Sequence, residues 1–213
     1  MRLMIFVAVA ALALGACDQP EANQRTPADA AAPTSAAPAA GSSAASFDCT
    51  AARGQAQELI CGDSTLAAMD REAARLAIAD PAGQAAFAKQ RDDCWKDDEL
   101  RQCVMSSTMV RIHQLRSASP NEGSGMSIGP VAFRCAGIES PLSATFVTSD
   151  PGAVALQWSG VTTAIDQVVA ASGARYEGRW DGQPVSFWNK GREATLTLPG
   201  KGDLACSQIV EPR

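Results

Sequence analysis

Ser172 and Lys190 are the two residues near the C-terminus whose types and settings could support chemistry. Each precedes a glycine, Gly173 or Gly191, which is typical of a turn that exposes its side chains. A hydroxyl and an ammonium group can donate hydrogen bonds to carboxylates, and charge-assisted bonds are the stronger kind. The same two residue types also form catalytic serine–lysine dyads. The pair therefore allows either carboxylate binding or hydrolysis.

Hydrolysis is the weaker of these interpretations. The sequence has no Ser-x-x-Lys signature, and we expect neither an oxyanion-hole motif nor a nucleophile elbow. We therefore expect a protein that is not an enzyme and that needs no cofactor. Composition alone leaves a third possibility open, in which both segments are ordinary turns with solvated side chains.

The cysteines and the single histidine argue against a metal site. There is no Cys-x-x-Cys pair, and His113 has no partner at ligand spacing, so we expect it to be an ordinary residue on a helix face. Apart from Cys17, an even set of six cysteines indicates a disulfide framework in an exported chain. Many pairings are possible, and the spacing favours Cys49–Cys61, Cys94–Cys103 and Cys135–Cys206.

The N-terminus has the features of a targeting segment. Arg2 is followed by an apolar run over 3–14 and by the sequence LGAC at 14–17. The run has the length of a signal-peptide core and is too short to span a bilayer comfortably. The LGAC ending resembles a bacterial lipobox, which predicts a lipoprotein signal peptide over 1–16 and lipidation of Cys17, with palmitate among the acyl chains. The alternative is an ordinary signal peptide with a chance cysteine.

Composition divides the rest of the chain into domains and linkers. Ala, Pro, Ser, Thr, Gln and Gly dominate 17–46, so we expect a lipidated, disordered tether. Helix-forming residues dominate 47–116, and a Pro-, Gly- and Ser-containing linker follows at 117–130. We predict two domains: a small, disulfide-stapled all-α domain followed by an antiparallel all-β small barrel over 131–213.

Local signals support both halves of this prediction. In the helical domain, Ser64 is a candidate N-cap, and Asp80 is a second candidate because Pro81 follows it. Beyond 131, β-branched and aromatic residues alternate with polar ones between turn signals about ten residues apart, which predicts short antiparallel strands. We expect four aromatic residues of this region to pack within the barrel: Trp158, Tyr176, Phe187 and Trp188.

The acidic balance of the chain bears on its partners. The formal net charge is −5. A nucleic-acid partner would need basic patches, so we expect none. An acidic chain is suited to meeting a basic protein, because long-range attraction raises the association rate.

Four motifs, in order and with matching cysteines, resemble the membrane-bound inhibitors of c-type lysozyme, small bacterial envelope proteins that block the lysozyme cleft. They are FRC at 133–135, SGARY at 172–176, FWNKGREA at 187–194 and LAC at 204–206. The resemblance covers about 131–209, and the stretch 177–184 is somewhat longer than in the family. It implies a barrel that inhibits c-type lysozyme.

The resemblance also assigns roles to residues by matching position. It gives the central roles to Ser172, whose loop enters the lysozyme cleft, and to Lys190, which reaches the two catalytic carboxylates. It adds Gly173, Arg175 and Tyr176 to the lysozyme-binding set, the last two as flanking contacts or loop braces.

The helical domain resembles the N-terminal domain of LprI-type lysozyme-inhibitor proteins. The matching pieces are FDC at 47–49, LIC at 59–61, LAAMD at 66–70, and RDDC at 91–94 followed by Cys103. This resemblance implies added lysozyme binding or contact with another envelope component, and it assigns no role to any single residue. The alternative is a stable spacer.

The predicted location is the cell envelope of a Gram-negative bacterium, on a membrane facing the periplasm, where the protein would serve host defence evasion. Asp18 directly after Cys17 is an inner-membrane retention signal in some bacteria, so the inner and outer membranes both remain open. The competing hypothesis is an envelope scaffold or adaptor lipoprotein whose barrel binds another protein or a peptidoglycan component.

Overall fold

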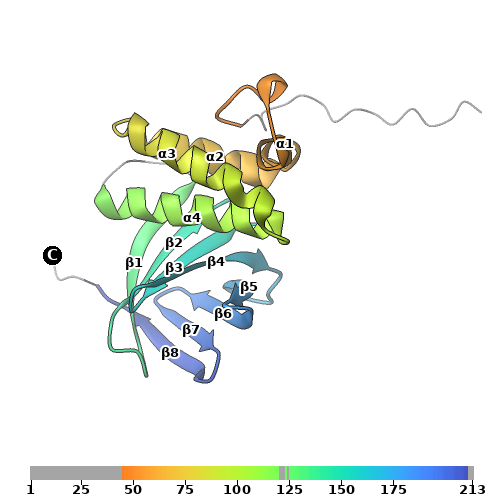
Figure 1. The fold of residues 1–213 in the computed structure, drawn as a ribbon. Helices are drawn as coiled ribbons and strands as arrows, with labels where there is room; N and C mark the ends of the chain where they lie inside the picture. The colour runs from red at the N-terminus through yellow and green to blue at the C-terminus, as the bar shows by residue number, and fades with distance from the viewer. Residues whose placement is uncertain (1–44, 120–122, 124, 211–213) are drawn as a thin grey trace, which may run out of the picture. The chain divides into compact units, whose positions relative to one another are not determined.

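A computed structural model describes residues 45–119, 123 and 125–210 of the chain (Figure 1). The predicted signal peptide, Cys17 and almost all of the predicted tether lie outside these residues. All of the described residues belong to one compact unit. In the described ranges, no helix is both long enough and apolar enough to cross a membrane.

Helices come first along the described chain, as predicted. They are α1 (Gln55–Gly62), α2 (Ser64–Leu76), α3 (Pro81–Asp92) and α4 (Leu100–Ala118), with short 3-10 helices at Cys49–Ala51 and Asp93–Lys96. The Asp80 carboxylate caps α3 as predicted, accepting the Gly83 N–H at 3.0 Å. The prediction for Ser64 is wrong, because it is already the first helical residue and the Asp63 carboxylate caps α2 instead.

Eight antiparallel strands follow and close into a barrel in which each strand pairs with the next and β1 pairs with β8. This confirms the predicted order of helices followed by an antiparallel barrel. The strands are β1 (Ser127–Cys135), β2 (Leu142–Val147), β3 (Ala153–Trp158), β4 (Val161–Val168), β5 (Ala174–Trp180), β6 (Gln183–Lys190), β7 (Glu193–Leu198) and β8 (Gly202–Gln208). Regular structure enters the 117–130 segment from both sides, since α4 ends at Ala118 and β1 begins at Ser127.

The barrel has an apolar interior, and a disulfide links the two strands that close it. Phe133, Leu156 and Phe187 are among its fully buried side chains. Cys135 and Cys206 are directly paired across β1 and β8 and form a disulfide there. The other two disulfides, Cys49–Cys61 and Cys94–Cys103, lie in the helical part.

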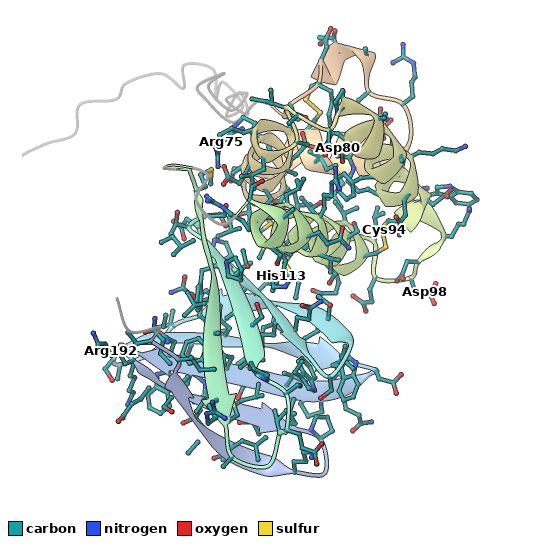
Figure 2. All side chains as sticks on the ribbon, turned by 90° about the vertical axis from the view of Figure 1, so that its left-hand side faces the viewer. Arg75, Asp80, Cys94, Asp98, His113 and Arg192 are labelled. Atoms are coloured by element: carbon teal, nitrogen blue, oxygen red, sulfur yellow. A yellow bond between two sulfur atoms is a disulfide. The ribbon has the colours of Figure 1, made fainter. Side chains whose placement is uncertain are left out.

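Helix α4 lies along the outer face of β1–β4 (Figure 1). We call the region where the helices contact this face the helix–barrel interface. The strands present small side chains to it, because Ala153, Ala155 and Ala164 belong to the same buried cluster as the helices. His113 of α4 lies between helix and barrel (Figure 2). Its Nδ1 is 2.8 Å from Thr145 Oγ1. Burial lowers the pKa of His113, with a weaker opposing effect from Gln157.

A buried polar network joins α2, α4 and β1 at the same interface. The Glu72 carboxylate accepts hydrogen bonds from the N–H and the hydroxyl of Ser127. It also accepts one from Arg75 at 2.8 Å and lies 3.5 Å from the Arg116 guanidinium. Burial raises the pKa of Glu72, but the bonds from Arg75 and Ser127 and the charge of Arg75 outweigh it and hold that pKa at about 2.

Candidate functional site

Residues 169–173, which we call the Ser172 turn, connect β4 to β5. This turn lies against the end of β6. Gly173 has φ +70°, a conformation that glycine adopts without a steric penalty. A Cβ atom at this position would be 2.4 Å from the Asn189 carbonyl oxygen and 2.8 Å from Lys190 Cγ. The turn and Lys190 can therefore touch only because residue 173 has no side chain.

Lys190 ends β6, and its side chain is exposed. The turn that follows returns the chain to β7, with Lys190 paired to Glu193 in register. The ammonium Nζ lies 3.5 Å from the centroid of the Trp188 ring, within the range of a cation–π contact. Figure 2 shows Arg192, two residues beyond Lys190, on the barrel and well separated from Cys94 and Asp98 of the helical part.

Trp188 connects the two predicted site residues. Its indole N–H donates a hydrogen bond to the Ser172 carbonyl oxygen at 2.9 Å, while its ring faces the Lys190 ammonium. The prediction that Trp188 packs inside the barrel is wrong, because Phe187 points inward and the next residue of a strand points outward. Two adjacent aromatic residues in one strand cannot both enter the core, and this alternation could have identified Trp188 from the sequence.

Arg175 and Tyr176 lie on opposite sides of the β5 wall. Arg175 is half-buried on the outside, where its guanidinium lies 5.8 Å from the Trp188 ring centroid and pairs with Glu177 at 2.7 Å. Tyr176 is buried beside Phe146, and burial raises the pKa of its hydroxyl. Tyr176 therefore cannot be a surface contact for a partner, and of the two roles predicted for it only that of a brace fits.

The other aromatic predictions concern the core. Phe187 is completely buried, and Trp158 is almost so, with its ring edge-on to Trp180 at 5.4 Å. Both expectations of barrel packing are confirmed.

A hollow of about 500 Å³ borders Lys190 on the outer face of the barrel. Its rim is formed on β6 by Trp188 and Lys190, on β7 by Glu193 and Thr195, and on β8 by Ala205 and Ser207. The mixture of apolar, cationic and anionic groups suits contact with a protein surface, and the hollow was not predicted from the sequence.

The chemistry that the cationic side chains bring to this site is hydrogen-bond donation. Lys190 and Arg175 supply cationic donors on the exposed face, beside the Ser172 turn. The only histidine, His113, lies at the helix–barrel interface and not at this site. In the part of the chain that the structure describes, no group of three or more His, Cys, Asp or Glu residues could hold a metal ion.

The expectation of no nucleophile elbow overlooks one sequence motif, GMSIG at 125–129, which has the spacing of such an elbow. An elbow joins a strand to a helix and exposes its serine, whereas Ser127 begins strand β1 and is buried. Its hydroxyl donates to Glu72 and accepts from Arg116. Ser127 is therefore a structural residue.

Residues 133–205 match the family described as membrane-bound lysozyme-inhibitor of c-type lysozyme. The matched segment contains the Ser172 turn, Trp188 and Lys190, and it leaves the helical part outside. Neither curated proteins nor solved structures gave a match. The family match supports a lysozyme-inhibitor role in general, with c-type lysozyme as the partner and the bacterial envelope as the location, and it argues against an enzymatic role.

Proposed function

We propose that this protein is a lipid-anchored envelope inhibitor of c-type lysozyme and that it inserts the Ser172 turn and Lys190 into the lysozyme active-site cleft. The observation that carries the proposal is the direct contact between the two. Gly173 brings the turn against the Lys190 stem on an exposed end of the barrel, inside the segment that matches the inhibitor family.

The proposed mechanism is the occupation of two carboxylates. A lysozyme uses one carboxyl group as a general acid and a second as nucleophile or stabiliser, with the substrate between them. The Lys190 ammonium donates to these carboxylates, and the Ser172 hydroxyl donates to one of them without adding charge. Each charge-assisted bond contributes about 1.5–3 kcal/mol. The bound loop excludes the glycan by occupying its place.

Delivery depends on the N-terminal segment. In this proposal acyl chains on Cys17 hold the protein on a membrane, because two or more chains anchor stably where one does not. A flexible tether over 17–46 would span roughly 30 Å on average, which lets the folded unit move away from the membrane surface.

The helical part, which we relate to LprI-type domains, supports the barrel in this proposal. Glu72 and His113 bind β1 and β2 from the helical side. Lys190 ends β6, which lies outside the strands that α4 covers, and the Ser172 turn leads from β4, the last covered strand, to β5. Ser172 and Lys190 are exposed to a partner while α4 packs against β1 to β4.

A turbidity assay tests the proposal. The full chain, purified in detergent, is titrated against a c-type lysozyme acting on bacterial cell walls, with a detergent blank. We expect stoichiometric inhibition, and its absence at micromolar protein would refute the proposed function.

Single substitutions then test the site. Loss of one charge-assisted bond in Lys190→Ala should weaken inhibition about 10- to 100-fold, and Ser172→Ala should weaken it less, because its hydroxyl is neutral. Lys201→Ala is the matched control, since Lys201 is an exposed lysine at another barrel turn. If the folded Lys190 and Ser172 variants inhibit like the parent, the site assignment is wrong even where the function is right.

A further inference from the structure

We propose that Trp188 is a positioning residue that holds the Ser172 turn and the Lys190 ammonium in one prearranged unit. This inference rests on the proposed function, because it concerns the same surface. It assigns a specific role to a residue that touches neither of the partner's carboxylates in the proposed mechanism.

The first observation is the hydrogen bond from the indole to the turn. Trp188 Nε1 donates to the Ser172 carbonyl oxygen at 2.9 Å, across 16 positions of sequence. The ladder of β4 and β5 begins at the Val168–Arg175 pair, so Ser172 lies beyond the strand pairing that could hold it. The side chain of Trp188 therefore supplies an attachment that the sheet does not give to this turn.

The second observation is the position of the lysine. The Lys190 side chain is exposed, and a free lysine of this kind samples many rotamers and loses that freedom when it binds. Here Nζ lies 3.5 Å from the Trp188 ring centroid. The ring selects a subset of rotamers before binding, which reduces the conformational entropy that complex formation must remove.

The third observation is that the same ring also contacts Arg175, at 5.8 Å from its guanidinium carbon. Glu177 pairs with that arginine at 2.7 Å. The indole is thus the common contact of the turn, the lysine and the flanking arginine. On binding, the Lys190 ammonium keeps the indole face on one side and donates to the partner's carboxylates from its other side.

Two substitutions separate the two contacts of Trp188. Trp188→Phe keeps an aromatic face for Lys190 and removes the N–H that holds the turn. Trp188→Leu removes both. Trp180→Phe is the matched control, because Trp180 is also half-buried in this barrel but stacks edge-on against Trp158.

The first measurement is made on the full chain in detergent without any lysozyme. The ε-methylene protons of Lys190 should resonate upfield in the parent, from the ring current, and in Trp188→Phe. They should return to the position of an ordinary solvated lysine in Trp188→Leu. Amide hydrogen exchange at 172–173 should accelerate in both variants and not in Trp180→Phe.

The second measurement is inhibition of a c-type lysozyme. We expect a loss of about 3-fold for Trp188→Phe and about 10-fold for Trp188→Leu. Because Trp188 acts partly through Lys190, the double variant Trp188→Leu/Lys190→Ala should lose less than the product of the two single losses.

Three results would overturn the positioning role. They are a Lys190 resonance unchanged in folded Trp188→Leu, inhibition by the Trp188 variants equal to that of the parent, and a loss of inhibition in the double variant equal to the product of the two single losses. If Trp188→Leu does not fold, Trp188→Phe decides through amide exchange and inhibition. A parent that fails to inhibit lysozyme refutes the proposed function instead, and the resonance and exchange data then decide the positioning role alone.

Discussion

Neutralising Glu72 should destabilise the fold in a manner that depends strongly on pH. Its side chain is 2 % exposed and binds Ser127 of β1, Arg75 of its own helix and Arg116 of α4. The substitution Glu72→Gln keeps the size of the side chain and removes the negative charge that Arg116 faces. It therefore tests the charge and leaves the packing in place.

The expected magnitude follows from the pKa of Glu72, which falls from its usual 4.5 to about 2 in the folded protein. Each unit of difference between the pKa in the folded and the unfolded protein corresponds to about 1.36 kcal/mol. The ionised carboxylate thus contributes about 3 kcal/mol of stability at neutral pH. Because the folded pKa is the lower one, this contribution is complete above about pH 5 and is lost as the pH falls toward 2.

Urea unfolding of the full chain in detergent at several pH values between 7 and 2.5 measures this contribution. The free energy of unfolding of the parent should exceed that of Glu72→Gln by about 3 kcal/mol at pH 7. This difference should shrink steadily below pH 4.5. Glu58→Gln is the control, because Glu58 is an exposed glutamate on α1. A gap that stays constant with pH, or one that Glu58→Gln reproduces, would refute the assignment of this stability to the buried charge.

Two further predictions concern the turn and the histidine. Gly173→Ala should weaken lysozyme inhibition at least tenfold, because its Cβ would lie 2.4 Å from a backbone oxygen; Gly200→Ala, with φ +73° and open space around it, has the same backbone penalty and should inhibit like the parent. His113→Gln should flatten the loss of stability that the parent shows as the pH falls below about 6.5, since burial lowers the pKa of this histidine and folding therefore favours its neutral form. Urea unfolding between pH 8 and 5 would contradict this reasoning if parent and variant lost stability equally.

The order of the elements could be predicted because it depends on local patterns. Helix formers, the Asp80 cap and the alternation of β-branched residues all act over a few neighbours, and the structure has helices followed by an antiparallel barrel. The predicted Ser64 cap differs from the observed Asp63 cap by one residue because both residues are capping types. Only the backbone geometry decides which side chain reaches the free N–H groups.

The helix–barrel interface could not be predicted, because it depends on pairs distant in sequence. Glu72 meets Ser127 across 55 positions, and His113 meets Thr145 across 32. Nothing near Glu72 in the sequence indicates that it will be buried. A charged residue in an amphipathic helix is normally solvated.

The candidate site was predicted only in part for a similar reason. Ser172, Gly173 and Lys190 came from turn signals and a family resemblance, and the structure brings them together. Residue type alone predicts that Trp188 packs in the core, because large aromatic residues usually do so. Its contacts with Ser172 and Lys190 depend on which way its strand faces, and that is set by the pairing of β5 with β6.

The simple strand order has a consequence for how the barrel can fold. Every pairing joins strands that are consecutive in the chain except that of β1 with β8, which brings together residues 71 positions apart. Consecutive hairpins close short loops at small entropic cost, whereas the final closure depends on a distant encounter. The Ser172 turn and Lys190 lie between β4 and β7, whose pairings all join strands that are consecutive in the chain. The part of the barrel that would meet lysozyme can therefore form before β1 pairs with β8.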